Sequence, residues 1–140
     1  MRKITFSILL FSFILLAGGI VALVKTFSTY HQVLEYDVSL NIVSEQQHAG
    51  LNVENDKIYF GTLSVGDSSA RQIKLKNTLK VPTRVLFEAK GAAGKYVVVP
   101  DNGYLLKSGE ERIFMVEARP PITVSVGNYT GKLIIYFLKV

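Results

Sequence analysis

The sequence has no cysteine and no tryptophan, and its 140 residues include only two histidines and four prolines. Without cysteine, the chain cannot be a disulfide-stapled mini-protein and cannot hold a thiolate zinc site. With two histidines, it has few side chains that act as acids or bases near neutral pH. A chain of this length has room for one modest core, which excludes a multidomain enzyme.

One long apolar run lies near the start of the chain. Residues 4–24 carry no charge, and 16 of these 21 residues are apolar. A helix of that length rises about 32 Å, which spans a hydrocarbon core of about 30 Å. A secretory signal also starts with basic residues, but its apolar part is usually shorter and ends at small residues of the Ala-x-Ala type. The candidate cleavage sequence Ile20-Val21-Ala22 has the bulky Ile20 at one of these positions. The run therefore predicts a retained signal-anchor transmembrane helix within residues 1–25, with a cleaved signal as the alternative.

The charges around the apolar run predict its orientation. Arg2 and Lys3 precede the run, and only Lys25 follows it closely. By the positive-inside rule, the N-terminus is cytoplasmic and the C-terminal domain is extracytoplasmic. The chain is then a single-pass membrane protein that contacts lipid through residues 4–24. Of the formal net charge of +5, these three residues supply +3, and the remaining +2 predicts no nucleic-acid partner.

The rest of the sequence alternates between apolar and polar residues. Tyr36, Val38, Leu40 and Ile42 alternate with polar side chains, which is typical of a half-buried strand. Turn residues separate further strand-like segments, and Asn102-Gly103 predicts a tight turn because both residues tolerate positive φ. We expect an all-β fold, an antiparallel β-sandwich of seven to eight strands. The further strands are expected at residues 57–60, 71–77, 83–89, 95–99, 104–106, 112–118 and 129–138.

Several segments of this region resemble a known group of domains. Residues 58–63 (Ile-Tyr-Phe-Gly-Thr-Leu) and 71–77 (Arg-Gln-Ile-Lys-Leu-Lys-Asn) are similar to the opening of Ig-like domains of the major-sperm-protein and abnormal-spindle-like kind. Residues 127–133 resemble the closing hairpin of such domains in prokaryotic, especially archaeal, surface proteins. The resemblance implies an Ig-like β-sandwich over residues 51–140 that acts as an adhesive, scaffolding or protein-binding module. Residues 26–50 are then a spacer with an accessory strand.

The side chains that could perform chemistry are few and scattered. The segment Gly91–Lys95 is similar to a phosphate loop, but Tyr96 follows where that loop needs Ser or Thr and a helix. Close carboxylate pairs occur only on expected turns, where water keeps their pKa values ordinary. We therefore predict that the protein is not an enzyme, with no catalytic residue, metal ligand or cofactor. The residues weighed and set aside are His31, His48, Glu54, Asp56, Glu110 and Glu111.

Residues 128–130 form the sequence Asn-Tyr-Thr, which is an N-glycosylation acceptor. An extracytoplasmic location would expose Asn128 to the modifying machinery. The alternative is that Gly127 and Asn128 only form the turn before the last strand. Asn128 is therefore a candidate glycosylation site.

The last expected strand is apolar on both faces. A strand at the outside of a small sandwich normally alternates, but residues 133–138 are all apolar. One interpretation is a central strand in a sheet whose outer face is covered by the long segment 26–50, with Tyr36–Ile42 as the available cover. The other is that this face, or an open strand edge, binds a partner by strand addition. The second interpretation makes Ile134, Tyr136 and Leu138 a candidate partner surface.

These observations predict a membrane-anchored extracytoplasmic Ig-like module. It would act in protein–protein interaction, or as a structural component of a cell-envelope complex, and it could associate with its own copies. The alternative is a subunit of a surface filament or pilus, assembled by donation of strand 34–43 after signal cleavage. A carbohydrate-binding module ranks behind both, because sugar binding usually relies on exposed aromatic platforms and the sequence has no tryptophan.

Overall fold

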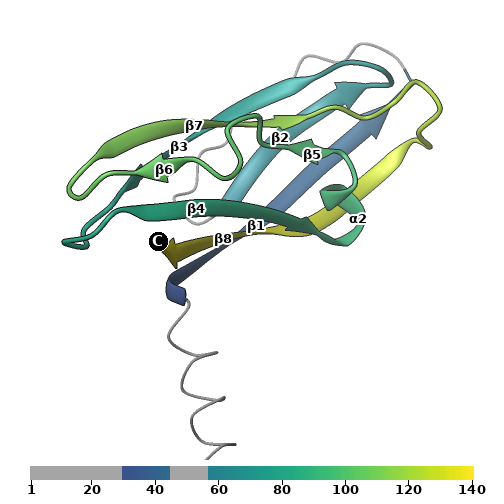
Figure 1. The fold of residues 1–140 in the computed structure, drawn as a ribbon. Helices are drawn as coiled ribbons and strands as arrows, with labels where there is room; N and C mark the ends of the chain where they lie inside the picture. The colour runs from purple at the N-terminus through teal and green to yellow at the C-terminus, as the bar shows by residue number, and fades with distance from the viewer. Residues whose placement is uncertain (1–29, 45–56) are drawn as a thin grey trace, which may run out of the picture.

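The protein is an all-β sandwich of two sheets in the computed structural model, which describes residues 30–44 and 57–140 (Figure 1). The described part contains eight strands, in agreement with the expected number, and one helical turn. In chain order they are β1 (Tyr30–Val43), β2 (Lys57–Ser64), β3 (Ser69–Lys76), β4 (Thr83–Lys90), α2 (Gly91–Gly94), β5 (Val97–Val98), β6 (Leu105–Leu106), β7 (Glu111–Ala118) and β8 (Gly127–Lys139).

The predicted transmembrane helix within residues 1–25 lies outside the described residues. Among residues 30–44 and 57–140, no helix has the length and apolar character needed to cross a bilayer. The placement of the anchor therefore stays a prediction from the sequence.

The larger sheet has the strand order β2-β1-β8-β4-β6, and the smaller sheet has the order β3-β7-β5. Strand β1 runs antiparallel to β8 but parallel to β2, with Asp37 opposite Lys57 and Val43 opposite Ser64. The expectation of purely antiparallel sheets is therefore wrong at this pair. The physical reason is the connection: parallel neighbours need about a dozen or more linking residues, and residues 44–56 supply that length.

The core lies between the two sheets and follows the predicted alternation. Ile73 and Leu75 of β3 and Val85 and Phe87 of β4 are buried, as the sequence pattern predicted. The Phe87 ring packs against Phe114 from the opposite sheet, with ring centroids 5.1 Å apart. Strand β1, the accessory strand expected within residues 26–50, is a full member of the larger sheet. It contributes three buried side chains to the core: Val38, Leu40 and Ile42.

A buried asparagine joins the two turns at one end of the sandwich. The Asn77 side chain is fully buried, and its Nδ2 donates hydrogen bonds to the carbonyl oxygens of Val81 at 2.9 Å, Leu106 at 3.1 Å and Lys107 at 3.1 Å. Its Oδ1 accepts a hydrogen bond from the Leu79 backbone N–H at 3.0 Å. Because these partners come from the β3–β4 connection, the end of β6 and the start of the β6–β7 connection, Asn77 holds these segments together.

The predicted tight turn at Asn102-Gly103 differs from expectation. Gly103 has a φ of +86°, but Asn102 does not have positive φ, since no described residue other than glycine does. The flanking strands β5 and β6 also belong to different sheets, so this segment crosses from one sheet to the other. A two-residue hairpin needs adjacent antiparallel strands, and these two strands are not neighbours.

Candidate interaction surface

Strand β8 is the central strand of the larger sheet and carries apolar side chains on both faces. Its inward residues Leu133, Ile135 and Phe137 are buried in the core. Its outward residues Ile134, Tyr136 and Leu138 are half-buried. The central position of β8 confirms one part of the first interpretation. The other part is wrong for Tyr36–Ile42, which lies in β1 beside β8 in the same sheet and does not cover its outer face. Residues 26–29 and 45–50 of the expected cover lie outside the described residues.

The neighbouring strands extend this apolar face on both sides. Val33 of β1 and Leu86 of β4 lie opposite Tyr136, one on each side, and cross-strand partners share a face of the sheet. Farther along, Arg84 lies between Leu138 and Leu105. Val33 is 49% exposed and Leu105 is 43% exposed. We call the apolar members of this face the outer patch: Val33, Leu86, Leu105, Ile134, Tyr136 and Leu138.

Charged side chains border the outer patch. The Tyr136 hydroxyl donates to Glu88 Oε2 at 2.8 Å, and Lys90 Nζ lies 3.2 Å from the same oxygen. These two contacts, the hydroxyl first, lower the pKa of the Glu88 carboxyl. On the β1 side, Lys132 pairs with Glu35, which raises the pKa of Lys132. An apolar centre with a charged rim is the usual composition of a protein-binding surface.

An open groove of about 660 Å³ continues the same face beyond the rim. Its floor depends on a close approach between Gly131 of β8 and the start of α2. A Cβ atom at Gly131 would lie 2.3 Å from the Lys90 carbonyl oxygen, so only glycine fits there. The lining offers hydroxyl and charged groups suited to hydrogen bonding with an extended ligand. These lining residues include Asp37, Ser39, Lys57, Tyr59, Thr130 and Lys132.

Side chains close two strand edges of the larger sheet. On the β4 edge, Asn102 bonds both backbone groups of Phe87: its Nδ2 donates to the Phe87 oxygen at 3.0 Å, and its Oδ1 accepts from the Phe87 N–H at 2.8 Å. On the β2 edge, Arg71 Nε donates to the Tyr59 carbonyl at 2.6 Å. An added strand would have to displace these contacts. The geometry therefore favours the face over these edges as a binding surface.

These two edge contacts were not predicted from the sequence. Asn102 was recognised only as a turn residue, because a single sequence does not show which backbone its amide reaches. No signal in the sequence singles out Arg71, which lies in β3 and not in the larger sheet.

The candidate glycosylation site lies away from the outer patch. Asn128 is exposed near the start of β8, opposite Asn41 of β1. The following Tyr129 is held in place, because its hydroxyl donates to the Ser125 carbonyl at 2.7 Å and its ring stands edge-on to Tyr96. The acceptor side chain is thus accessible, and its modification stays a prediction that the intact mass of native material would check.

The remaining chemical candidates do not assemble into a site. Glu110 accepts hydrogen bonds from the Lys107 backbone N–H at 2.7 Å and from the Tyr104 hydroxyl at 3.1 Å. The first of these contacts is the main cause of the lowered pKa of the Glu110 carboxyl, which therefore closes a turn. Glu111 pairs with Lys74 at 2.8 Å. His48, Glu54 and Asp56 fall outside the described residues, as does the side chain of His31.

Within residues 30–44 and 57–140, no three His, Cys, Asp or Glu side chains gather to form a possible metal site. The segment Gly91–Gly94 is the short helix α2, and it leads through Lys95 and Tyr96 into β5. The prediction that the protein is not an enzyme rests on the sequence and stays a prediction.

The comparisons with known proteins give little further identification. The sequence matches no protein-family model, and no curated protein is significantly similar to it. Among solved structures, the chain is similar to the antigen and type I fimbria protein of Burkholderia pseudomallei, at 16% sequence identity and a TM-score of 0.31. That match covers 76% of this chain and 96% of the other chain. A likeness of this size carries no conclusion about function.

Proposed function

We propose that the chain is a membrane-anchored extracytoplasmic Ig-like module that binds a protein partner in the cell envelope through the outer patch. The observation that carries the proposal is the outward face of β8, where Ile134, Tyr136 and Leu138 are successive apolar positions on the outside of the sandwich. Apolar neighbours flank this row on both sides, and ion pairs border it.

A protein partner fits this surface best. Water-facing positions of a two-layer sandwich are normally polar, because they gain nothing from apolar side chains in the free state. Contiguous exposed apolar patches bordered by polar residues mark binding surfaces. The aromatic ring of Tyr136 adds a large contact area with a polar end, which is the side-chain type enriched at interfaces.

Two features of the sequence support the placement at a membrane. The uncharged run at residues 4–24 has the length of a transmembrane helix, and the basic residues before it favour a cytoplasmic N-terminus. The resemblance to Ig-like surface domains agrees with an extracytoplasmic module. The anchor would hold the domain at the membrane surface, and the outer patch would bind its partner there.

The filament alternative requires β1 to leave its own sheet. In the described structure, β1 pairs with β8 on one side and with β2 on the other. Donation to another subunit would also remove Val38, Leu40 and Ile42 from the core. The mass of the native N-terminus separates the two functions: an intact Met1 or Arg2 supports the anchor, and a mature chain that starts near Thr26 supports the filament.

The test of the proposed partner surface compares two lysine substitutions. Val33→Lys places a charge in the outer patch, and Val126→Lys places the same charge on a loop side chain that is 59% exposed. Full-length protein is purified in detergent from native membranes after cross-linking. The proposal expects a protein that cross-links to the wild type and to Val126→Lys but not to Val33→Lys, with equal melting temperatures. Equal cross-linking by all three proteins, or by none, would contradict it.

A further inference from the structure

We infer that the end of the sandwich where β1 begins lies against anionic lipid headgroups, held there by basic side chains from separate parts of the chain. This inference rests on the proposed function, because the anchor brings the domain to the bilayer. We call this end the base. It consists of the turn at residues 77–82, the turn at residues 107–110, and the last residues of the chain, Lys139 and Val140.

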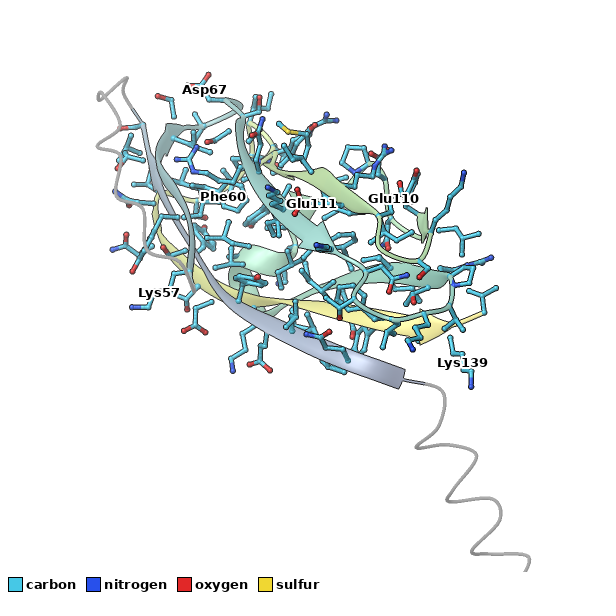
Figure 2. The ribbon with its side chains drawn as sticks, turned by 90° about the vertical axis from the view of Figure 1, so that its left-hand side faces the viewer. Lys57, Phe60, Asp67, Glu110, Glu111 and Lys139 are labelled. Carbon is cyan, nitrogen blue, oxygen red and sulfur yellow. The ribbon has the colours of Figure 1, made fainter. Side chains whose placement is uncertain are left out.

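The pairing of the strands brings these segments together. Tyr30, the first residue of β1, lies opposite Leu138 of β8. Thr83, the first residue of β4, lies between Lys139 and Leu106 in the sheet. Figure 1 shows the end of the chain beside the start of β1, and Figure 2 shows Lys139 at the same place. The first residue of β1 therefore lies at the base, and the predicted membrane helix precedes this residue in the chain.

The reach of the chain keeps the base close to the bilayer. Only residues 25–29 separate the apolar run from the first residue of β1. Even fully extended, this distance is about 20 Å at about 3.4 Å per residue. The headgroup layer itself occupies about 5–8 Å of that distance. The base thus lies within about 15 Å of the headgroup surface, a distance comparable with the Debye length of about 10 Å at 0.1 M salt.

The opposite end of the sandwich is farther from the anchor. Strand β3 runs from Ser69 at the far end to Lys76 at the base. Its eight residues extend about 26 Å, at about 3.3 Å per residue. A label at the far end is therefore clearly separated from a label at the base, which makes the orientation measurable.

The base carries an excess of positive charge. Its exposed basic side chains form no ion pair with any carboxylate of residues 30–44 and 57–140. One nearby carboxylate, Glu110, is engaged in closing its own turn, and Glu111 is neutralised by Lys74. Three cations of the base and Arg84 beside it, set against the carboxylates of Glu110 and of the chain end at Val140, leave a charge of +2. These cations are Lys80, Arg84, Lys107 and Lys139.

Apolar side chains accompany these charges. Val140 is 66% exposed and Leu105 is 43% exposed, and both adjoin the basic residues of the base. Basic side chains with apolar neighbours suit the boundary between headgroups and acyl chains, where the charge meets phosphate and the apolar part leaves water. An anionic lipid surface therefore matches the base in charge and in apolar character.

The absence of native cysteine allows an unambiguous test by single labels. Thr78→Cys places a fluorescent donor on an exposed position of the base, and Ser68→Cys places one on an exposed turn at the far end. The full-length chain is reconstituted into vesicles whose labelled headgroups act as energy acceptors. One set of vesicles contains phosphatidylglycerol with phosphatidylcholine, and the other contains phosphatidylcholine alone.

The inference expects strong energy transfer from position 78 in the anionic vesicles and weak transfer from position 68. The transfer from position 78 decreases in phosphatidylcholine alone and at 1 M salt, where the Debye length is about 3 Å. Neutralising Lys80, Lys107 and Lys139 together as glutamines decreases it as well, because each basic residue near the surface favours lipid contact about fivefold. The matched control replaces three basic residues toward the far end with glutamine: Lys90, Lys95 and Arg119.

Two outcomes would overturn the inference. One is equal energy transfer from positions 78 and 68. The other is transfer from position 78 that does not respond to anionic lipid, salt or the triple substitution. Resistance of the reconstituted chain to alkaline extraction tests the anchor in the same samples. If the chain resists alkaline extraction but energy transfer from position 78 does not respond to anionic lipid, salt or the triple substitution, this inference alone is contradicted. If alkali extracts the chain from the vesicles, the proposed function and the inference are both contradicted. Equal melting temperatures of the triple variants exclude unfolding as the cause.

Discussion

The side chain of Asn102 pairs with the backbone of Phe87 as a neighbouring strand would. Its amide donates to the Phe87 oxygen at 3.0 Å and accepts from the Phe87 N–H at 2.8 Å. Strand β6 pairs with β4 only at Thr83 and Arg84, so this part of the β4 edge would otherwise be open. One side chain thus satisfies two backbone groups, and it closes an edge that could pair with another chain.

We expect Asn102→Ala to destabilise the fold by about 1–2 kcal/mol, because two backbone groups of Phe87 lose their partner. Amide hydrogen exchange at Phe87 should become faster than in the wild type. Urea denaturation gives the free energy of unfolding, and nuclear magnetic resonance follows the exchange. Asn128→Ala, an exposed asparagine of β8, is the control and should change neither quantity. Unchanged exchange at Phe87 in Asn102→Ala would show that the pairing has no role in closing the edge.

Asn77→Asp should be more harmful than its small change in shape suggests. The Nδ2 group of Asn77 donates to three carbonyl oxygens, and a carboxylate has no proton to donate in its ionised form. A buried charge facing three carbonyl oxygens should cost about 3 kcal/mol or more. Thermal melting checks this expectation against Asn128→Asp. Similar melting temperatures for the two variants would mean that Asn77 is not the residue that holds the turns together.

Phe87→Ala should cost about 3–5 kcal/mol of stability, because it removes a buried ring from a small core. The ring is 7% exposed and lies 5.1 Å from Phe114 between centroids. Val98→Ala, at a position that is 46% exposed, is the matched truncation and should cost less than about 0.5 kcal/mol. Chemical denaturation measures both. An unchanged midpoint for Phe87→Ala would contradict the placement of this ring in the core.

Stability should decrease in acid through two carboxyl groups. Hydrogen bonding lowers the pKa of Glu88 and of Glu110 below the ordinary value of 4.5. The unfolded chain therefore binds protons more readily than the folded chain, so the stabilisation is complete above that value and is lost as the pH falls through the lowered pKa values. Melting curves between about pH 6 and pH 3 should show this loss, and Glu88→Gln and Glu110→Gln should each reduce it. Identical acid profiles for the variants and the wild type would contradict the assignment.

The alternation of apolar residues was sufficient to predict which side chains enter the core. In β3 and β4 the residues expected to face inward are the buried ones, because a strand repeats every two residues and its own sequence defines its faces. The candidate surface was predicted in the same way: Ile134, Tyr136 and Leu138 stood out because they break that alternation. The rest of the outer patch was not predicted, because Val33, Leu86 and Leu105 come from other strands.

Three local departures show where sequence patterns stop being informative. The segment Gly91–Gly94 was considered as part of a phosphate loop, but it folds into a helical turn that bridges to Gly131. Asn102 was expected to have positive φ, but it stabilises the fold through its side-chain amide, which bonds the backbone of Phe87. Arg71 gave no signal, although its guanidinium reaches across to the β2 edge. In each case the partner lies more than ten residues away in the chain.

The sequence by itself determined the class of fold, the inward faces of β1, β3 and β4 and the apolar character of the outward face of β8. These properties depend on the hydrophobicity and spacing of nearby residues, which a single chain displays directly. Only the tertiary structure decided that β1 inserts between β2 and β8, that its pairing with β2 is parallel, and that the basic turns gather where β1 begins. Those properties depend on which distant segments become neighbours, and a two-residue repeat contains no information about that choice.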